Sequence, residues 1–563
     1  MRYLLYLIIL ICCNTLSGQA DQLNKLIEQY HTAQDQRSKQ NKSAWPALSK
    51  PKLQAENKEY QTFLKDLNEV DKSNLNQQDL INLELLQLII NDKIDNLNYR
   101  SELFPLSAEG GFIISMIYST KGKRLTSPAA ISNYKALLND TPRYIDEQIQ
   151  NMKTGLSTNK VMPKLIADNC LTLLDKVLSE NLDFLKQPLT NPTVSEEQKS
   201  SMTSIIDGKV NSSLLELREF LSKEYIPNTL SEVGIGHCNE GKSYYKQRVQ
   251  YYTTLDMTPE EVFELGNKEV KRIKAEMLQI IEALEYDGSF SDFIEHLRTD
   301  PKYYAQTPQE LLNHAAWLSM KAQEILPRYF TTLPSLPFTV NPVPADIAPT
   351  YTTGRYSGGS FADRKAGEYW VNTYNLPARP KYVLPSLTLH EAVPGHHLQI
   401  SLAKELELPK FRKTQYLSAF GEGWGLYAEY LGKEAGIYTT PYEDFGRLTY
   451  EMWRACRLVV DPGIHYYGWT REQAITFMAE NTSLSLHEVN TEIDRYIGWP
   501  GQAVSYKIGE LKIRELRKRA EEKLGEKFDI REFHDLLLSN GSIPLSSLER
   551  IVDGYIVEKW QSK

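Results

Sequence analysis

Cysteine is scarce in this chain of 563 residues, which holds five, two of them within the first twenty residues. The other three, Cys170, Cys238 and Cys456, lie far apart in the sequence. Because their number is odd and their spacing wide, the pattern excludes a disulfide framework and a zinc site made of cysteines. Cys456 lies in an apolar helical pattern, so we expect its thiol to be buried in the core.

The chain also has no excess of positive charge. It contains 64 Lys and Arg and 72 Asp and Glu, which gives a formal net charge of −8. Without a basic surplus to neutralise phosphates, a nucleic-acid partner is not expected. After residue 20 no stretch is long and apolar enough to span a membrane, so the mature chain should have no transmembrane segment. The sequence also has no internal repeat and no low-complexity segment.

The first twenty residues read as a targeting segment. Arg2 supplies a positive start, Leu4–Cys13 is an apolar run too short to span a membrane, and Gly18-Gln19-Ala20 offers small residues for cleavage. The pattern predicts a signal peptide over residues 1–20 and export to the periplasm or beyond. A lipid anchor on Cys13 is an alternative, although the Ile-Cys pair before it fits a lipobox poorly.

Helical patterns dominate the rest of the chain, so we predict a mainly α fold. An N-terminal helical region over 21–250 and a catalytic region over 251–563 should form one continuous body. A helix should start at the capping sequence Thr258-Pro259-Glu260-Glu261 and end near Leu284. The other expected helices are Asp79–Ile94, Ala129–Gly155, Met162–Leu185, Ser195–Ser222, Pro308–Ile325, Leu417–Glu434, Tyr442–Val460, Thr470–Asn481, Leu486–Ile497, Gly501–Leu524 and Ile530–Leu538.

Three of the ten histidines fall within eight residues of the segment Leu387–Gln399, which reads L-T-L-H-E-A-V-P-G-H-H-L-Q. Imidazole is the commonest neutral metal ligand, and Glu391, directly after His390, stands where a metalloprotease keeps its general base. The alternative is a helix break that carries surface histidines. The apolar residues before the pair favour the metal site.

The spacing of these histidines rules out a regular helix through the site. His390 and His396 would point roughly 120° apart, and His390 and His397 would align with about 10 Å between their backbones. Zinc–nitrogen bonds are only about 2.0–2.1 Å long. Pro394-Gly395 can interrupt the helix, because proline lacks an N–H and glycine tolerates unusual dihedral angles. We predict a bulge that brings His396 to the metal, with His397 as the alternative ligand or a supporting donor.

A third ligand could come from Phe420–Tyr430, which reads F-G-E-G-W-G-L-Y-A-E-Y. Glu422 lies between glycines that allow close helix packing, and acidic residues are rarely buried unless paired or metal-bound. Taken alone, Glu422 could be a carboxylate at a helix start. Glu429 falls seven residues later on the same face, and we expect it to support the ligands or the fold.

Residues 330–384 break the helical pattern and carry many Pro and Gly. Tyr369–Tyr374 is the best strand candidate, and gives a small β element before the histidine motif. Such a strand could pair its edge with an extended peptide. A short structural hairpin is the alternative.

The two motifs together resemble the bacterial family called domain of unknown function 885, which is grouped with the gluzincin metallopeptidases. Supporting similarity lies at Thr253–Val262, Arg457–His465 and Arg495–Ala503. The resemblance implies a large multi-helix body with a central cleft and a zinc ion (Zn2+). It also implies His390, His396 or His397, and Glu422 as ligands, with Glu391 as general base.

Such a mechanism needs a donor to the developing oxyanion besides the metal. The resemblance favours Tyr506 and His465, and Arg495 is a third candidate. Their structural alternatives are core packing, a loop cap and an ion pair. Asp461 could orient a ligand histidine, or simply begin a turn at Asp461-Pro462-Gly463, which we favour.

The sequence therefore predicts an exported zinc metallopeptidase that acts on peptides or oligopeptides, and by analogy with helical relatives it cuts near the C-terminus. Two other functions stay open. One is a zinc hydrolase of a non-peptide amide, and the other is a non-enzymatic helical binding protein with a degenerate metal motif.

Overall fold

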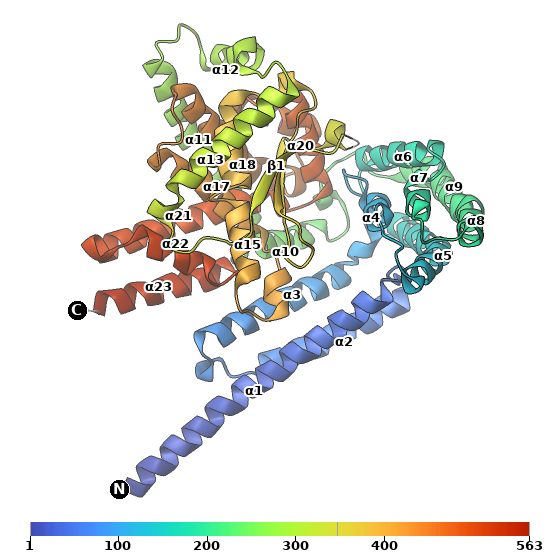
Figure 1. Cartoon of the computed structure of the whole chain (residues 1–563), viewed down its shortest axis with the longest axis horizontal. Coiled ribbons are helices and arrows are strands. Elements are labelled where there is room, and N and C mark those ends of the chain that lie inside the picture. The colour runs from blue at the N-terminus through green and yellow to red at the C-terminus, as the bar shows by residue number, and fades with distance from the viewer. Residues whose placement is uncertain (1, 346, 562–563) are drawn as a thin grey trace. The chain divides into compact units, whose positions relative to one another are not determined.

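A computed structural model describes residues 2–345 and 347–561 of the chain (Figure 1). Helices comprise 73% of the structure, and the strands form one small three-stranded sheet. The predicted mainly α class is thus confirmed. The chain divides into two compact units. The first runs to Tyr244 and takes in Ile497–Trp499, and the second comprises Tyr245–Tyr496 and Pro500–Lys563.

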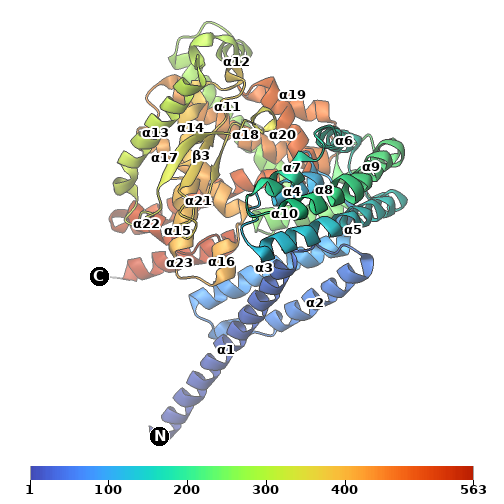
Figure 2. The same ribbon diagram turned by 45° about the vertical axis from the view of Figure 1, so that its right-hand side comes forward.

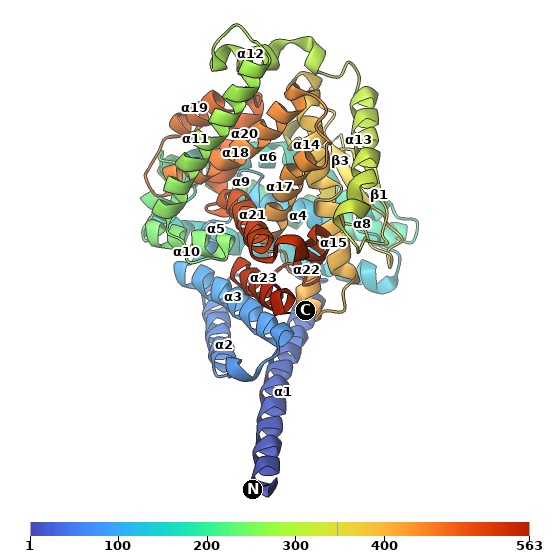
Figure 3. The same cartoon turned by 90° about the vertical axis from the view of Figure 1, so that its left-hand side faces the viewer.

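The first unit is made of helices. Helix α3 packs against α2, and its residues Ile81, Leu85 and Ile90 are fully buried. The first half of α1 extends beyond both helices (Figure 3). The predicted signal peptide forms that first half, apart from Met1, which lies outside the described residues. The helices are α1 (Arg2–Gln40), α2 (Lys50–Asn68), α3 (Gln77–Tyr99), α4 (Gly111–Thr120), α5 (Pro128–Thr158), α6 (Lys164–Ser179), α7 (Asp183–Lys186), α8 (Glu196–Ile205), α9 (Asn211–Phe220) and, across the boundary, α10 (Gly241–Thr253).

None of the described helices combines the length and the apolar character that a membrane crossing requires. The three cysteines Cys170, Cys238 and Cys456 are free and buried, in line with the prediction from their spacing.

The second unit carries the histidine motif. Its first long helix starts where the sequence predicts, with a capping box between Thr258 and Glu261, and ends at Ala283. The helices are α11 (Pro259–Ala283), α12 (Phe290–Thr299), α13 (Pro308–Tyr329), α14 (Leu384–Glu391), α15 (His396–Glu405), α16 (Lys410–Thr414), α17 (Ser418–Glu434), α18 (Pro441–His465), α19 (Arg471–Asn481), α20 (Leu486–Gly498), α21 (Ser505–Leu524), α22 (Ile530–Leu538) and α23 (Leu545–Gln561).

Two helix pairs form the core of this unit, α11 with α18 and α17 with α21. Gly423 and Gly509 permit the second pair, because a Cβ on Gly423 would lie 2.6 Å from the Cα of Gly509. The face of α17 that carries Glu422 and Glu429 is thereby fixed in the interior.

Helix α18 is longer than predicted. The expected turn at Asp461-Pro462-Gly463 is wrong, because α18 continues through Pro462 to His465. Every residue from Phe445 to His465 is buried. Packing on all sides of the helix thus outweighs the low helix propensity of Pro462 and Gly463.

The sheet consists of β1 (Phe338–Pro342), β2 (Gly354–Ser357) and β3 (Gly367–Val371) in the order β1-β3-β2. Strand β3 is parallel to β1 and antiparallel to β2. The predicted strand Tyr369–Tyr374 overlaps β3, but both edges of β3 are paired, so the expectation that it could receive a peptide is wrong. Strand β2 lies at an edge and contacts α14, beside which the sheet is seen in Figure 2.

Candidate metal centre

The helix that carries His390 stops where the spacing of the histidines requires a break. Helix α14 ends at Glu391 and α15 begins at His396, so the interruption is complete rather than the predicted bulge. A Cβ on Gly395 would lie 2.0 Å from the carbonyl oxygen of His390, so glycine is needed there. The indole nitrogen of Trp424 donates to the carbonyl oxygen of Pro394 at 2.8 Å and so satisfies one group that the break leaves free.

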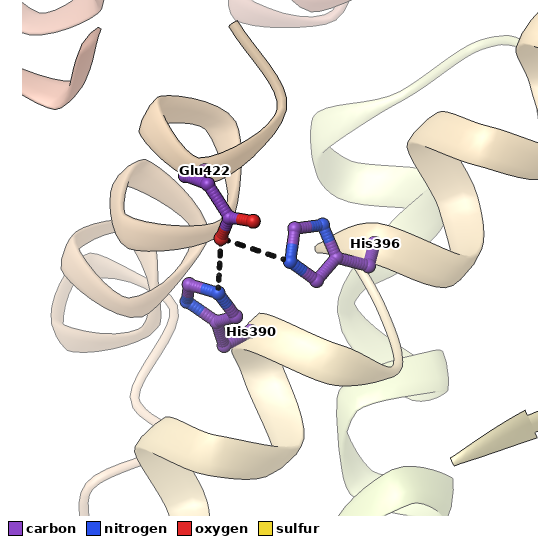
Figure 4. Close-up of side chains that lie close together, drawn as sticks. All are labelled: His390, His396 and Glu422. Atoms are coloured by element: carbon purple, nitrogen blue, oxygen red, sulfur yellow. Dashed lines mark hydrogen bonds and ion pairs between the residues drawn. The ribbon is translucent and has the colours of Figure 1, made fainter. Parts of the chain in front are cut away.

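Three ligand atoms converge across this break (Figure 4). The Nε2 atoms of His390 and His396 each lie 3.3 Å from Oε2 of Glu422, and all three atoms lie within 4.8 Å of one another. Helix α17 approaches closely because residue 425 is glycine, whose added Cβ would lie 2.7 Å from the His390 ring. In the described part of the chain no other His, Cys, Asp and Glu side chains form such a group.

His397, the alternative ligand, faces the sheet. Its Nδ1 lies 3.0 Å from the hydroxyl of Tyr356 and 3.3 Å from that of Ser401, and its ring lies 4.6 Å from that of Phe338. Burial lowers the pKa of His397 to about 4, so the ring is neutral. The break thus brings His396, and not His397, to Glu422.

Glu429 holds the far side of the His390 ring. Its Oε1 lies 2.8 Å from Nδ1 of His390 and 3.3 Å from the guanidinium of Arg454, and all three side chains are buried. A carboxylate in this position keeps the proton on Nδ1 and leaves the Nε2 lone pair available to a metal. Glu429 therefore occupies the supporting position that its spacing from Glu422 predicts.

The charges of the group favour a cation. Burial lowers the pKa of His390, but the carboxylates of Glu422 and Glu429 raise it to about 9 overall. Burial raises the pKa of Glu422, yet His396 and His390 hold it well below its usual range. Two imidazole nitrogens and one carboxylate oxygen also form the usual protein donor set of a catalytic zinc site. The residues present therefore fit a divalent metal, which would replace the proton that the carboxylates otherwise retain.

Glu391 lies at the end of α14 and is 8% exposed. Its carboxylate accepts a hydrogen bond of 2.7 Å from the backbone nitrogen of Tyr356 in β2. The edge strand β2 thus holds the carboxylate of Glu391, the residue that follows the candidate ligand His390.

The three predicted oxyanion donors differ in their surroundings. Tyr506 is half-buried in the first turn of α21, with the guanidinium carbon of Arg457 4.2 Å from its ring centre. Arg495 is an ion-pair partner, at 3.1 Å from Glu492, and also donates to Gln502.

His465 ends α18, where its Nε2 lies 3.0 Å from the carbonyl oxygen of Tyr496 and its ring lies 5.2 Å from that of Tyr245. Burial lowers the pKa of His465 to about 4. Asp461 accepts hydrogen bonds from the hydroxyl of Tyr245 at 2.6 Å and the nitrogen of Gly501 at 3.1 Å. The proposal that Asp461 orients a ligand histidine is thus not supported, since Glu429 makes that contact.

Tyr416 contacts the candidate group although no sequence pattern predicts it. Its hydroxyl donates to Oε1 of Glu422 at 2.8 Å, and its ring lies 6.4 Å from that of His396. The side chain is 40% exposed. Tyr416 is one of 33 tyrosines and lies in no motif, so the only available signal is its place six residues before Glu422.

Two solved structures resemble this chain closely. The crystal structure of a candidate lipoprotein from Colwellia psychrerythraea is 26% identical, covers 97% of this chain and 99% of its own, and has a TM-score of 0.86. A candidate lipoprotein of unknown function from Shewanella oneidensis is 17% identical, with coverage of 96% and 99% and a TM-score of 0.73, which shows the shared fold alone.

No curated protein matches the chain. Residues 31–552 match the model of the family described as "Bacterial protein of unknown function (DUF885)". The match confirms the resemblance drawn from the paired motifs, and the chain belongs to the DUF885 family.

Proposed function

We propose that the chain is an exported zinc-dependent peptidase. The observation that carries the proposal is the convergence of His390, His396 and Glu422 across a broken helix. Glu391, the residue after His390, is held by the backbone nitrogen of Tyr356. Two histidines, a downstream glutamate and a glutamate directly after the first histidine form the donor and base set of a metallopeptidase.

His390, His396 and Glu422 would hold zinc, which supplies Lewis acidity toward a water molecule and the scissile carbonyl. Glu391 takes a proton from the attacking water and passes it to the nitrogen of the leaving amine. The hydrogen bond from the nitrogen of Tyr356 keeps the carboxylate in one orientation for both transfers. Glu429 holds the His390 ring in the tautomer that presents Nε2.

A hydroxyl near the ligands would stabilise the oxyanion of the tetrahedral intermediate. Tyr506 remains the first candidate from the sequence, and Tyr416 joins it because its hydroxyl lies at Glu422. His465 and Arg495 are less suited, since both are held by other contacts. The central cleft expected from the resemblance would give peptides access to these groups.

Export is supported by the basic start and the short apolar run Leu4–Cys13. The structural relative from Colwellia psychrerythraea, described as a candidate lipoprotein, supports a lipid anchor as the alternative to cleavage. Mass spectrometry of the mature N-terminus distinguishes the two outcomes.

The decisive experiment combines metal analysis with a peptide-library digest of the purified mature chain. We expect about one zinc per chain and hydrolysis of peptide bonds. Glu391→Gln should retain the metal and lose turnover, because the ligands are intact and the base is absent. The matched control is Glu407→Gln, an exposed glutamate just after α15, which should change neither.

Absence of bound zinc would reject the enzyme and favour a binding protein with a degenerate motif. Bound zinc with hydrolysis only of non-peptide amides would favour the other hydrolase.

A further inference from the structure

One tyrosine of the edge strand β2 contacts both sides of the break in the histidine motif. The backbone nitrogen of Tyr356 donates to the carboxylate of Glu391 at 2.7 Å, where α14 ends. The hydroxyl of the same residue lies 3.0 Å from Nδ1 of His397 and 3.4 Å from the hydroxyl of Ser401, both on α15. A single residue of the sheet thus connects the helix before the break with the helix after it.

The two residues on either side of the break that this tyrosine contacts each follow a candidate ligand in the sequence. Glu391 follows His390, and His397 follows His396. Because the Cα atoms of adjacent residues are only about 3.8 Å apart across a planar peptide unit, holding Glu391 and His397 limits how far the two ligand backbones can separate. The edge strand therefore acts on the spacing of the two histidines that meet at Glu422 (Figure 4).

The hydroxyl of Tyr356 has a fixed position, and the side chain is 7% exposed. A Cβ on Gly367 of β3 would lie 2.3 Å from this hydroxyl oxygen, so the oxygen occupies space that only a glycine leaves open. The ring of His397 in turn lies 4.6 Å from that of Phe338 in β1. All three strands of the sheet therefore contribute to the contact with α15.

A metal held by two separate helices requires that their spacing be set before the metal binds. Zinc–nitrogen bonds are only about 2.0–2.1 Å long, and any ordering of the two helices on binding would be subtracted from the affinity. Pro394-Gly395 interrupts the helical hydrogen bonds that would otherwise join α14 to α15. The sheet offers a rigid support in their place, as a preorganised site needs.

We propose that Tyr356 is a positioning residue that holds α14 and α15 together across the break and so sets the distance between His390 and His396 before zinc binds. The inference rests on the zinc site of the proposed function and adds the residue that prepares this site. It also gives His397 a role as the point where α15 is attached to the sheet. Since Tyr356 also holds Glu391, the ligands and the proposed general base share one support.

Tyr356→Phe removes the hydroxyl contact with α15 and keeps the backbone hydrogen bond to Glu391. We expect the variant to bind zinc about 10-fold more weakly, as measured by chelator competition starting from metal-free protein. The visible absorption bands of the cobalt-substituted protein report the ligand geometry and should change in the variant. Urea unfolding of the metal-free protein separates a loss of stability from a loss of positioning.

The matched control is Tyr369→Phe. Tyr369 pairs with Tyr356 in the register of the sheet and is fully buried, and its hydroxyl lies 3.3 Å from that of Thr388 on α14. This variant loses an equally buried hydroxyl on one side of the break. It should therefore keep the zinc affinity and the cobalt spectrum of the parent even where its stability falls.

His397→Phe tests the same contact from its other end, because it keeps a ring against Phe338 and removes the acceptor. We expect a loss of zinc affinity of about 10-fold, and the double variant with Tyr356→Phe should lose no more than either single variant. Should Tyr356→Phe fail to fold, the comparison of His397→Phe with the parent decides the question. Losses that multiply in the double variant would overturn the proposal, and so would complete loss of zinc binding in His397→Phe, which would make His397 a ligand.

The parent chain separates this inference from the function beneath it. Zinc binding by the parent, with the same affinity and the same cobalt spectrum in Tyr356→Phe, would overturn the role of Tyr356 and leave the metal site intact. No zinc binding by the parent would overturn both.

Discussion

At the scale of single residues, the candidate centre depends on side chains that form hydrogen bonds with the candidate ligands and hold them in place. Glu429 and Tyr416 each form a hydrogen bond of 2.8 Å with a member of the candidate metal group, Glu429 with His390 and Tyr416 with Glu422. Sequence spacing placed Glu429 on the correct face of its helix. It could not find Tyr416, because this residue reaches Glu422 through the loop between two helices rather than through a periodic pattern.

Glu429→Gln should lower zinc affinity by about 10- to 100-fold, because the amide no longer stabilises the Nδ1 proton of His390 as a carboxylate does. Competition with a chelator measures the change. Glu434→Gln on the same helix is the control, since the exposed Glu434 pairs with Arg517 and not with the candidate metal group. Equal zinc affinity in both variants would show that Glu429 serves the fold alone.

Tyr416→Phe should reduce kcat by about 100-fold if its hydroxyl stabilises the oxyanion, with zinc content unchanged. Steady-state kinetics with a peptide substrate and metal analysis of the same sample check both parts. Tyr467→Phe, an exposed tyrosine beyond α18, should have no effect. A normal kcat in Tyr416→Phe combined with a low kcat in Tyr506→Phe would assign the role to Tyr506.

At the scale of elements, the candidate site is formed where a helix is interrupted between α14 and α15. The need for the cut follows from the numbers of residues between His390, His396 and His397. The length of the interruption does not follow from this spacing. Four residues, Ala392 to Gly395, lie outside the helix, whereas a bulge would displace fewer residues. The neighbouring Trp424, which bonds the carbonyl of Pro394, makes the wider break tolerable.

Gly395→Ala should disturb this break, since its Cβ would lie 2.0 Å from the oxygen of His390. We expect a loss of about 1–3 kcal/mol in the free energy of unfolding and weaker zinc binding. Urea unfolding and chelator competition measure the two effects. Gly554→Ala in α23 meets no atom within 4 Å, and should be neutral or stabilising. Zinc binding by Gly395→Ala at full affinity would contradict the need for glycine.

At the scale of the whole molecule, several histidines serve as neutral buried groups rather than as ligands. His534 lies between the hydroxyl of Tyr427 at 2.7 Å and the carbonyl oxygen of Tyr329 at 2.9 Å. Burial lowers the pKa of His534 to about 3 and that of His465 to about 4. The sequence marked His465 as a catalytic candidate, and only its packing against Tyr245 shows how deeply it is enclosed.

Stability should therefore fall on acidification below pH 6.5. In that range the unfolded chain takes up a proton at each of these histidines and the folded chain does not, which favours unfolding. Each histidine contributes a slope of up to about 1.4 kcal/mol per pH unit until its folded pKa is reached. Thermal melting between pH 5 and 7.5 should show Tm falling toward pH 5, and His534→Gln should flatten the dependence. An unchanged slope in His534→Gln would exclude this histidine as a source.

The sequence by itself determined the helical class, the capped start of α11, and the necessity of a break between Glu391 and His396. These features depend on neighbours within a few turns of the chain, where periodicity and the chemistry of Pro and Gly act directly. The tertiary structure alone decided that His397 faces the sheet, that β3 is enclosed on both edges, and that α18 runs through Pro462. Each of these depends on a partner from a distant part of the chain, and no local pattern specifies which partner that is.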